Sequence, residues 1–199
     1  MRSVSIFVAA LAFGGGTFAM SRDAHALGPI GVEVGAKVGA ATNPLSSQGT
    51  VTPPTPLGFG VGARGGVDIL GFYGGVNFMY YLGSSQDITV PGQSGSVSFH
   101  TVMYGLELGY GVTLLDLLTI RPQIGIGNAT FSESGNASGV LNGSASGPNK
   151  SYLYLEPGVT GLIGLGLWYV GADANVLFFP GLDQSKASLS IHGQIGIKF

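Results

Sequence analysis

The 199-residue chain has no cysteine and few charged side chains. Without cysteine it forms no disulfide, and it offers no thiolate as a metal ligand or nucleophile. Charged residues make up 9% of the chain, whereas soluble globular domains usually carry about 25%. The net charge of -2 argues against a nucleic-acid partner, which would require a basic surface. The composition therefore excludes thiol chemistry and is unusual for a protein surrounded by water.

Long apolar runs are also scarce, and the only one lies at the start of the chain. Arg2 precedes an apolar stretch over residues 4–20, and a small-x-small site follows at residues 24–26. This order predicts a secretory signal peptide over residues 1–26 that is cleaved on export, with cleavage after Ala19 as the alternative.

The remaining residues, 27–199, suit one domain, because no Pro-rich linker or shift in composition divides them. Glycine is abundant, with 36 residues in the whole chain, and the mean hydropathy is +0.40. No segment of this part has the roughly 20 apolar residues of a spanning helix. If the protein lies in a membrane, it must cross as strands of a closed barrel.

Eight segments alternate between large apolar residues and small or polar ones, which is the period of a β-strand with one apolar face. In the first segment, Val34 and Val38 share a face, and Glu33 and Lys37 share the opposite one. The eight predicted strands are residues 29–42, 57–70, 71–82, 99–112, 118–131, 152–163, 167–178 and 188–199.

Every charged residue within these segments lies on the face opposite the large apolar residues. An Arg or Lys that faced lipid at mid-depth would cost about 2–4 kcal/mol. The pattern therefore predicts apolar side chains outside and ionic ones in the interior. With one histidine added, the predicted interior network is Glu33, Lys37, Arg64, Asp68, Glu107, Arg121, Glu156, Asp173, His192 and Lys198.

The connections between the predicted strands alternate in length. Short ones fall near residues 70–71, 113–117 and 164–166, and long polar ones fall at residues 43–56, 83–98, 132–151 and 179–187. Short periplasmic turns and long extracellular loops are typical of outer-membrane barrels. The alternation also agrees with an even number of strands.

Aromatic residues lie near the ends of the predicted strands. Phe72, Tyr110 and Trp168 fall at the short-turn edge, and Tyr80 and Phe178 fall toward the loop edge. These positions predict interfacial girdles. The alternative is that aromatic residues favour strands at any position.

The last eleven residues alternate large apolar with small or polar side chains and end on an aromatic residue, with Ile191, Gly193, Ile195, Ile197 and Phe199 on one face. On these residues and the strand pattern, the chain resembles the small eight-stranded outer-membrane barrels, the group that includes the membrane domain of outer membrane protein A. The resemblance implies an antiparallel, up-and-down transmembrane β-barrel in a Gram-negative type envelope. It also implies that Ile191, Ile195, Ile197 and Phe199 form the assembly signal read by the barrel-assembly machinery.

The predicted interior network has two possible uses. Eight strands leave an interior that side chains just fill, so paired charges can plug the lumen. The many inward glycines favour the alternative, a narrow gated pore for ions or small solutes. We expect the plug, because open aqueous channels belong to barrels with about 16 strands or more.

Catalysis has one candidate set of residues. Asp173 and His192 are expected to lie opposite each other on neighbouring strands. Ser190 is two residues from His192, which is about 7 Å along a strand and too far for a nucleophile to contact its base. With three histidines and no cluster of ligands, a zinc site is not expected either. We therefore expect a protein that is not an enzyme and has no cofactor.

The sequence favours a non-enzymatic outer-membrane barrel with a structural, envelope-integrity or surface-display role, whose partners are the lipid bilayer and the assembly machinery. The pore is the first alternative. The second is a soluble exported barrel like a lipocalin that binds an apolar ligand inside. That barrel would need the polar faces of its strands to point outward, and the loops name no extracellular ligand.

Overall fold

Antiparallel β-strands account for the regular structure of the computed structural model, which describes residues 30–45, 55–90, 93–115, 117–139, 143–183 and 185–199. In this part of the chain, no helix is long and apolar enough to cross a membrane. The predicted signal peptide over residues 1–26 lies outside the described residues, so its cleavage stays a prediction.

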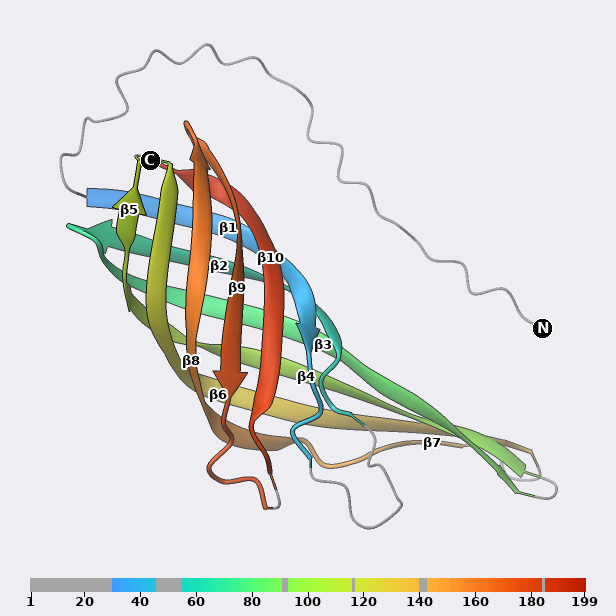
Figure 1. Ribbon diagram of the computed structural model, residues 1–199. Helices are drawn as coiled ribbons and strands as arrows, with labels where there is room; N and C mark the ends of the chain where they lie inside the picture. The colour runs from blue at the N-terminus through green and yellow to red at the C-terminus, as the bar shows by residue number, and fades with distance from the viewer. Residues whose placement is uncertain (1–29, 46–54, 91–92, 116, 140–142, 184) are drawn as a thin grey trace.

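Eight strands close into a barrel in the order β4-β3-β2-β1-β10-β9-β8-β6, and pairing between β4 and β6 completes the ring (Figure 1). The fold class predicted from the sequence is confirmed. Short β5 pairs with β6 just beyond the end of β4, and β7 pairs with the far end of β6. The strands are β1 (Ile30–Ala41), β2 (Phe59–Ile69), β3 (Phe72–Val90), β4 (Gln93–Tyr110), β5 (Val112–Leu114), β6 (Leu118–Gly139), β7 (Gly143–Ser146), β8 (Lys150–Leu165), β9 (Trp168–Leu177) and β10 (Ser188–Lys198).

The seam between the first and last strands is fully bonded. β1 pairs with β10 so that Val34 lies opposite Ile197. Beyond that register, the Val32 amide donates to the Phe199 carbonyl at 2.6 Å, and the Phe199 amide donates back to Val32 at 3.0 Å. The terminal strand therefore closes the ring along its whole length, leaving no free edge at the seam.

Two of the four predicted long loops are wrong, because the chain continues there as paired strands. Residues 83–98 mostly belong to β3 and β4, and residues 132–146 mostly belong to β6 and β7. Their Ser, Gly and Thr content suggested a loop, but backbone pairing such as Ser96 with Asn136 needs no apolar face. We call these parts of β3, β4, β6 and β7 the extension; it projects from the barrel at the end opposite the C-terminus (Figure 1).

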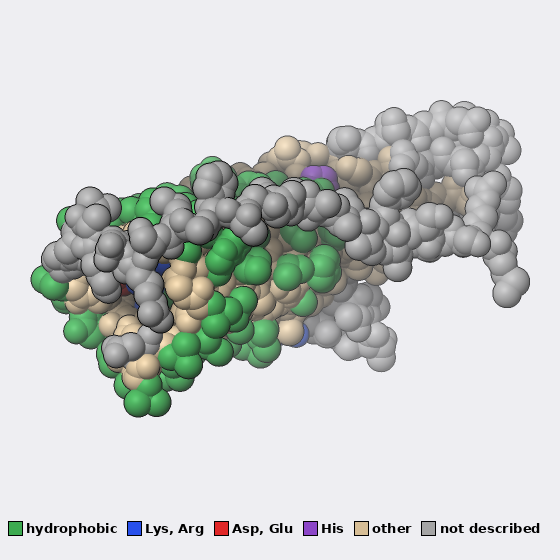
Figure 2. Space-filling view, turned by 90° about the horizontal axis from the view of Figure 1, so that it is seen from above, with side chains coloured by type: hydrophobic (Ala, Val, Ile, Leu, Met, Phe, Trp, Pro, Cys, Tyr) green, Lys and Arg blue, Asp and Glu red, His purple; other side chains and the backbone are tan. Residues whose placement is uncertain are grey.

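Within the barrel, side chains of the eight ring strands alternate between the outside and the lumen. In β10, Ile191 and Ile195 are exposed, and His192 and Gln194 are buried. We call the part of the barrel's outer face where the large apolar side chains of the ring strands are exposed the apolar belt. In the described part of the chain, no charged residue lies on this face between those apolar side chains. Figure 2 shows hydrophobic side chains covering much of the visible barrel face and thinning toward the extension.

Candidate functional site

The lumen holds the ionic residues that the sequence assigned to the interior. All ten line the lumen, and all are buried except Asp68 and Lys198, whose side chains are 15% and 41% exposed near the short-turn end. Their ion pairs form two clusters, one near the short turns and one at mid-height.

Arg121 spans the lumen in the cluster near the short turns. It extends from β6, and three strands separate β6 from β1 on either side of the ring. Its guanidinium donates two hydrogen bonds to the Glu33 carboxylate on β1, at 2.9 and 2.8 Å. Lys198 lies 3.1 Å from Glu33, and Asp68 lies 3.5 Å from Arg121. The bidentate pair therefore ties opposite walls of the barrel together.

An aromatic ring links the two clusters. The Tyr73 ring lies below the guanidinium carbons of Arg121 and Arg64, at 4.1 and 4.7 Å from its centroid. The Tyr73 hydroxyl also accepts a hydrogen bond from Arg64 Nε at 3.3 Å. Cation-π contacts of this kind gain strength when the cation is shielded from water, as both guanidiniums are here.

The mid-height cluster alternates cations and carboxylates. Glu107 lies 3.2 Å from Arg64 and 3.9 Å from Lys37, and Lys37 lies 3.1 Å from Asp173. Gln194 accepts a hydrogen bond from Arg64 at 3.2 Å. Such a network offsets the high desolvation cost of burying each charge, whereas an isolated ion would not be tolerated.

Asp173 and His192 do lie opposite each other and share a 2.7 Å hydrogen bond through Nδ1. The other ring nitrogen, Nε2, is joined to the Tyr81 hydroxyl at 2.7 Å. Ser190 instead donates to Glu156 at 3.5 Å. The arrangement is a buried chain of Asp173, His192 and Tyr81, and the serine is not part of it. In the described part of the chain, no three His, Asp or Glu side chains are placed to hold a metal ion.

The loop end of the lumen is apolar, which the sequence did not predict. We expected the inward face to be polar or tiny, and that expectation is wrong here. Inward parity alone could have placed Met79, Tyr81 and Met103 in this layer, but Leu57 and Phe179 enter it from outside the strands. The buried members are Ala41, Leu57, Met79, Tyr81, Met103, Ala129, Tyr154, Leu177 and Phe179, with Phe131 and Leu182 packed against them.

Inward glycines make room for the large lumen side chains. A Cβ atom on Gly35 would overlap the hydroxyl of Tyr169, and one on Gly66 would lie 2.6 Å from the Tyr73 ring. A Cβ on Gly60 would lie equally close to Tyr81. These glycines therefore do not open a path along the barrel. They let buried aromatic rings lie against the barrel wall and fill the lumen.

Replacing Gly35 with alanine is expected to destabilise the barrel, because the added methyl group displaces Tyr169. Adding Tyr169→Phe removes the overlapping hydroxyl and should restore part of the loss. Gly161→Ala is the matched control, since a Cβ atom there meets nothing within 4 Å. Urea unfolding of the four proteins measures the effect; equal midpoints for Gly35→Ala and Gly161→Ala would contradict close packing.

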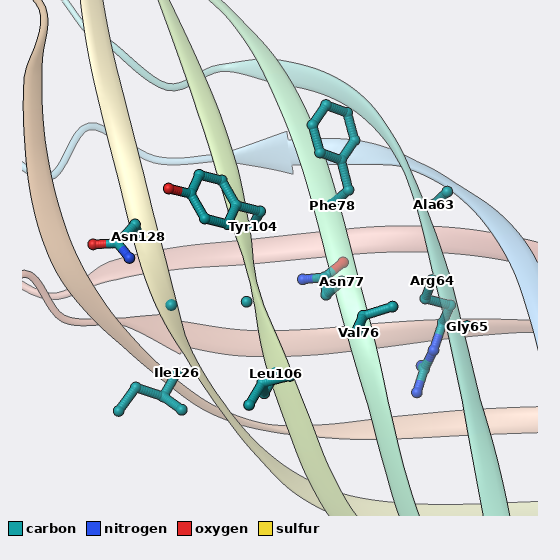
Figure 3. Close-up of a pocket in the computed structure, with 12 residues that line it drawn as sticks. Ala63, Arg64, Gly65, Val76, Asn77, Phe78, Tyr104, Leu106, Ile126 and Asn128 are labelled. Carbon is teal, nitrogen blue, oxygen red and sulfur yellow. The ribbon is translucent and has the colours of Figure 1, made fainter.

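A shallow groove of about 730 Å³ crosses the outer face of β2, β3, β4 and β6. In Figure 3, Phe78 and Tyr104 lie along one side of it, and Leu106 and Ile126 lie along the other. These four side chains are exposed, whereas Arg64, which also borders the groove, is buried in the lumen. The groove is thus a hollow bordered by the apolar belt.

The aromatic residues predicted for the girdles face outward. Phe72, Tyr110, Trp168 and Phe178 are exposed, and Tyr80 is half-buried against the ring of His100. Phe72 and Tyr110 stack edge-to-face with centroids 4.9 Å apart at the short-turn end. Their position at a membrane interface stays a prediction.

The residues proposed as an assembly signal lie together on the outer face of β10. Ile191, Ile195 and Phe199 are exposed, and Ile197 is half-buried. Their recognition by assembly machinery stays a prediction, as does the absence of catalysis.

Comparisons with known proteins bear on the fold alone. No family model matches the sequence, and no curated protein is significantly similar to it. A major outer membrane protein from Thermus thermophilus superposes with a TM-score of 0.60 at 13% identity, covering 85% of this chain and 99% of that one. The chain has the fold of an eight-stranded outer-membrane barrel. Neisserial surface protein A is a second barrel of this fold, with a TM-score of 0.52, 14% identity, and coverage of 86% of this chain and 97% of that one.

Proposed function

We propose that the protein is an integral outer-membrane barrel with a sealed lumen, which serves envelope integrity or surface display and has no enzymatic activity. One observation carries this proposal: a closed ring of strands exposes an apolar belt on its outer face and holds buried ion pairs in its lumen. Lipid can surround such a surface, because the strands of a closed ring bond their backbone groups to one another.

The same observation opposes a soluble lipocalin-like barrel. Val34, Leu106 and Ile195 are each at least half exposed and face away from the lumen. In water, a contiguous apolar surface of this size would drive association. An apolar ligand inside would also displace ion pairs such as Lys37 with Asp173.

Sealing is favoured over a pore by the contents of the lumen. Arg121 and Glu33 cross it near the short turns, the Lys37 cluster fills its middle, and the apolar layer closes the loop end. Water and ions would have to pass all three regions. The pore therefore remains an alternative without an observation in its favour.

The extension supports a display role. Beyond an irregularity in register after Leu82, its strands β3 and β4 are paired through the backbone from Ser85 with Ser98 to Val90 with Gln93. It lies at the end that the outer-membrane arrangement would direct away from the cell. A paired projection of this kind would present small polar side chains such as Ser85 to the surroundings on a framework of strands.

Planar-bilayer recording tests the sealed lumen. We expect the wild-type protein, reconstituted from detergent, to give no discrete currents in 1 M KCl. Steady unitary currents in every preparation would overturn the sealed barrel and favour the pore. Arg64→Ala and Glu107→Ala serve as comparison variants: they would change the size or selectivity of such currents if ions passed the mid-height cluster.

A further inference from the structure

Leucines occupy the short turns of this barrel, where polar residues would be expected in contact with water. Leu70 lies in the turn between β2 and β3, Leu115 and Leu117 lie on either side of Asp116 in the sequence between β5 and β6, and Leu165 ends β8 just before Leu167 in the turn to β9. We call these five residues the leucine turns. All are exposed, Leu70 by 70% and Leu115 by 96%.

Two of these five leucines also have an unfavourable backbone conformation. Leu70 and Leu115 both have φ of 53°, in the left-handed region that a branched side chain disfavours. Leu70 and Gly71 have positive φ in succession, as in the tight hairpin turn that normally takes Asn-Gly. An asparagine would relieve the strain at either position. The leucine side chains therefore do not favour the turn conformation. Another interaction of these side chains offsets the strain.

Backbone groups of the turns are bonded to neighbouring strands. The Gly71 carbonyl accepts from Gly111 at 2.7 Å, and the Leu117 carbonyl accepts from Gly164 at 2.8 Å. The Leu167 carbonyl accepts from Lys198, also at 2.8 Å. A turn in water needs no such partners, whereas a turn at membrane depth requires them.

The height of the apolar belt places its lower boundary at these turns. Outward residues of β6 are apolar from Leu118 to Ile126, and the polar Asn128 follows on the same face. Those nine residues, at about 3.4 Å each on a strand tilted by about 40°, span about 23 Å. This falls just short of the apolar band of an outer-membrane barrel, which is about 25 Å tall. The band is therefore filled only if it reaches down to the turns.

We propose that the leucine turns are seated in the periplasmic leaflet of the membrane, so that a lipid surface covers them. This inference rests on the proposed membrane location and specifies how deep in the membrane the turns lie. The turns are continuous with the apolar belt, and their leucines extend it by one further ring of contacts. The barrel then ends at the membrane surface and does not project into the periplasm.

Fluorescent labels on single cysteines test this depth, since the natural chain has no cysteine. The fluorophore NBD is attached at Leu115→Cys, at Leu106→Cys in the belt and at Gln86→Cys in the extension, in phosphatidylcholine nanodiscs whose two faces are open to solvent. We expect the label at position 115 to resemble that at 106: blue-shifted emission, quenching by doxyl-labelled lipid and weak quenching by iodide.

The outcomes separate the two proposals. If the label at 115 behaves like that at 86 while that at 106 is quenched by lipid, the turns lie in water and the inference is wrong, but the membrane location stands. If neither 106 nor 115 is quenched by lipid, the membrane location fails as well. A blue shift at 115 that depends on protein concentration and not on doxyl lipid would identify a second copy as the occupant, which also overturns the inference.

A substitution at Leu70 gives an independent readout with opposite signs. Leu70→Asn relieves the backbone strain, so a turn in water should become more stable and its urea midpoint should rise. A turn seated in the leaflet should instead lose stability, because the amide is moved out of water. We expect a lower midpoint in bilayers; a higher one would overturn the proposal.

Discussion

Replacing Arg121 with methionine lowers the free energy of unfolding by about 3–5 kcal/mol on this account, because removal of one partner leaves a buried charge uncompensated. Among the described residues, Glu33 would keep Lys198 at 3.1 Å as its ion-pair partner, and that side chain is partly open to solvent. The Tyr73 ring would also lose its closer guanidinium. Urea unfolding in lipid vesicles, followed through the single tryptophan, Trp168, measures the loss.

Lys186→Met is the control for this prediction, since it removes a cation from an exposed position at the loop end. The double variant Glu33→Gln with Arg121→Met should cost less than the two single losses added together, because the two side chains share one interaction. Equal losses for Arg121→Met and Lys186→Met would show that the cross-lumen pair contributes nothing to stability.

Arginine in place of Leu106 should destabilise the barrel by about 2–4 kcal/mol, the cost of a cation on the lipid face near the bilayer midplane. Leu106 is 59% exposed and lies midway along the outward apolar residues of β4, which run from Val102 to Tyr110. In a soluble protein, a charge at so exposed a site would change stability by less than about 0.5 kcal/mol. The sign and size of the effect therefore report what surrounds the belt.

The matched change is Gln86→Arg, which adds the same charge at an exposed position of the extension. We expect its unfolding midpoint to stay at the wild-type value. Folding yield into vesicles, read from the shift of the folded band on unheated gels, gives a second measure. If Leu106→Arg folds as well as Gln86→Arg, hydrocarbon does not cover this face.

The sequence was sufficient for the ring strands and for the faces of their side chains. Lys37 lies on the opposite face of its strand from Val34 and Val38. Only one orientation of that strand places the charge in the lumen and the valines against lipid. The extension was missed for the same reason: Ser96 and Asn136 pair through the backbone in water, where neither face needs to be apolar. The alternation of apolar and polar residues indicates that one face of a strand is covered. Where neither face is covered, the sequence shows no such alternation.

Partners across the lumen could not be predicted. Arg121 meets Glu33 although 88 positions separate them, because strand order and register place β6 opposite β1. His192 is hydrogen-bonded to Tyr81 and not to Ser190. Tyr81 reaches it from β3, and β1 and β2 lie between β3 and β10 in the ring. These contacts depend on the geometry of closure, which no local pattern contains.

Spin labels on single cysteines along β4 measure the central claim, that hydrocarbon surrounds the barrel and side chains fill it. Labels at Val102, Leu106 and Leu108 face outward, and those at Met103 and Glu107 face the lumen. In bilayers, the account predicts high collision rates with oxygen and low rates with a water-soluble nickel chelate for the outward set, highest for oxygen at Leu106. Both rates should be low for the inward set. Outward labels that collide mainly with nickel would contradict the membrane location, and inward labels that do so would contradict the sealed lumen.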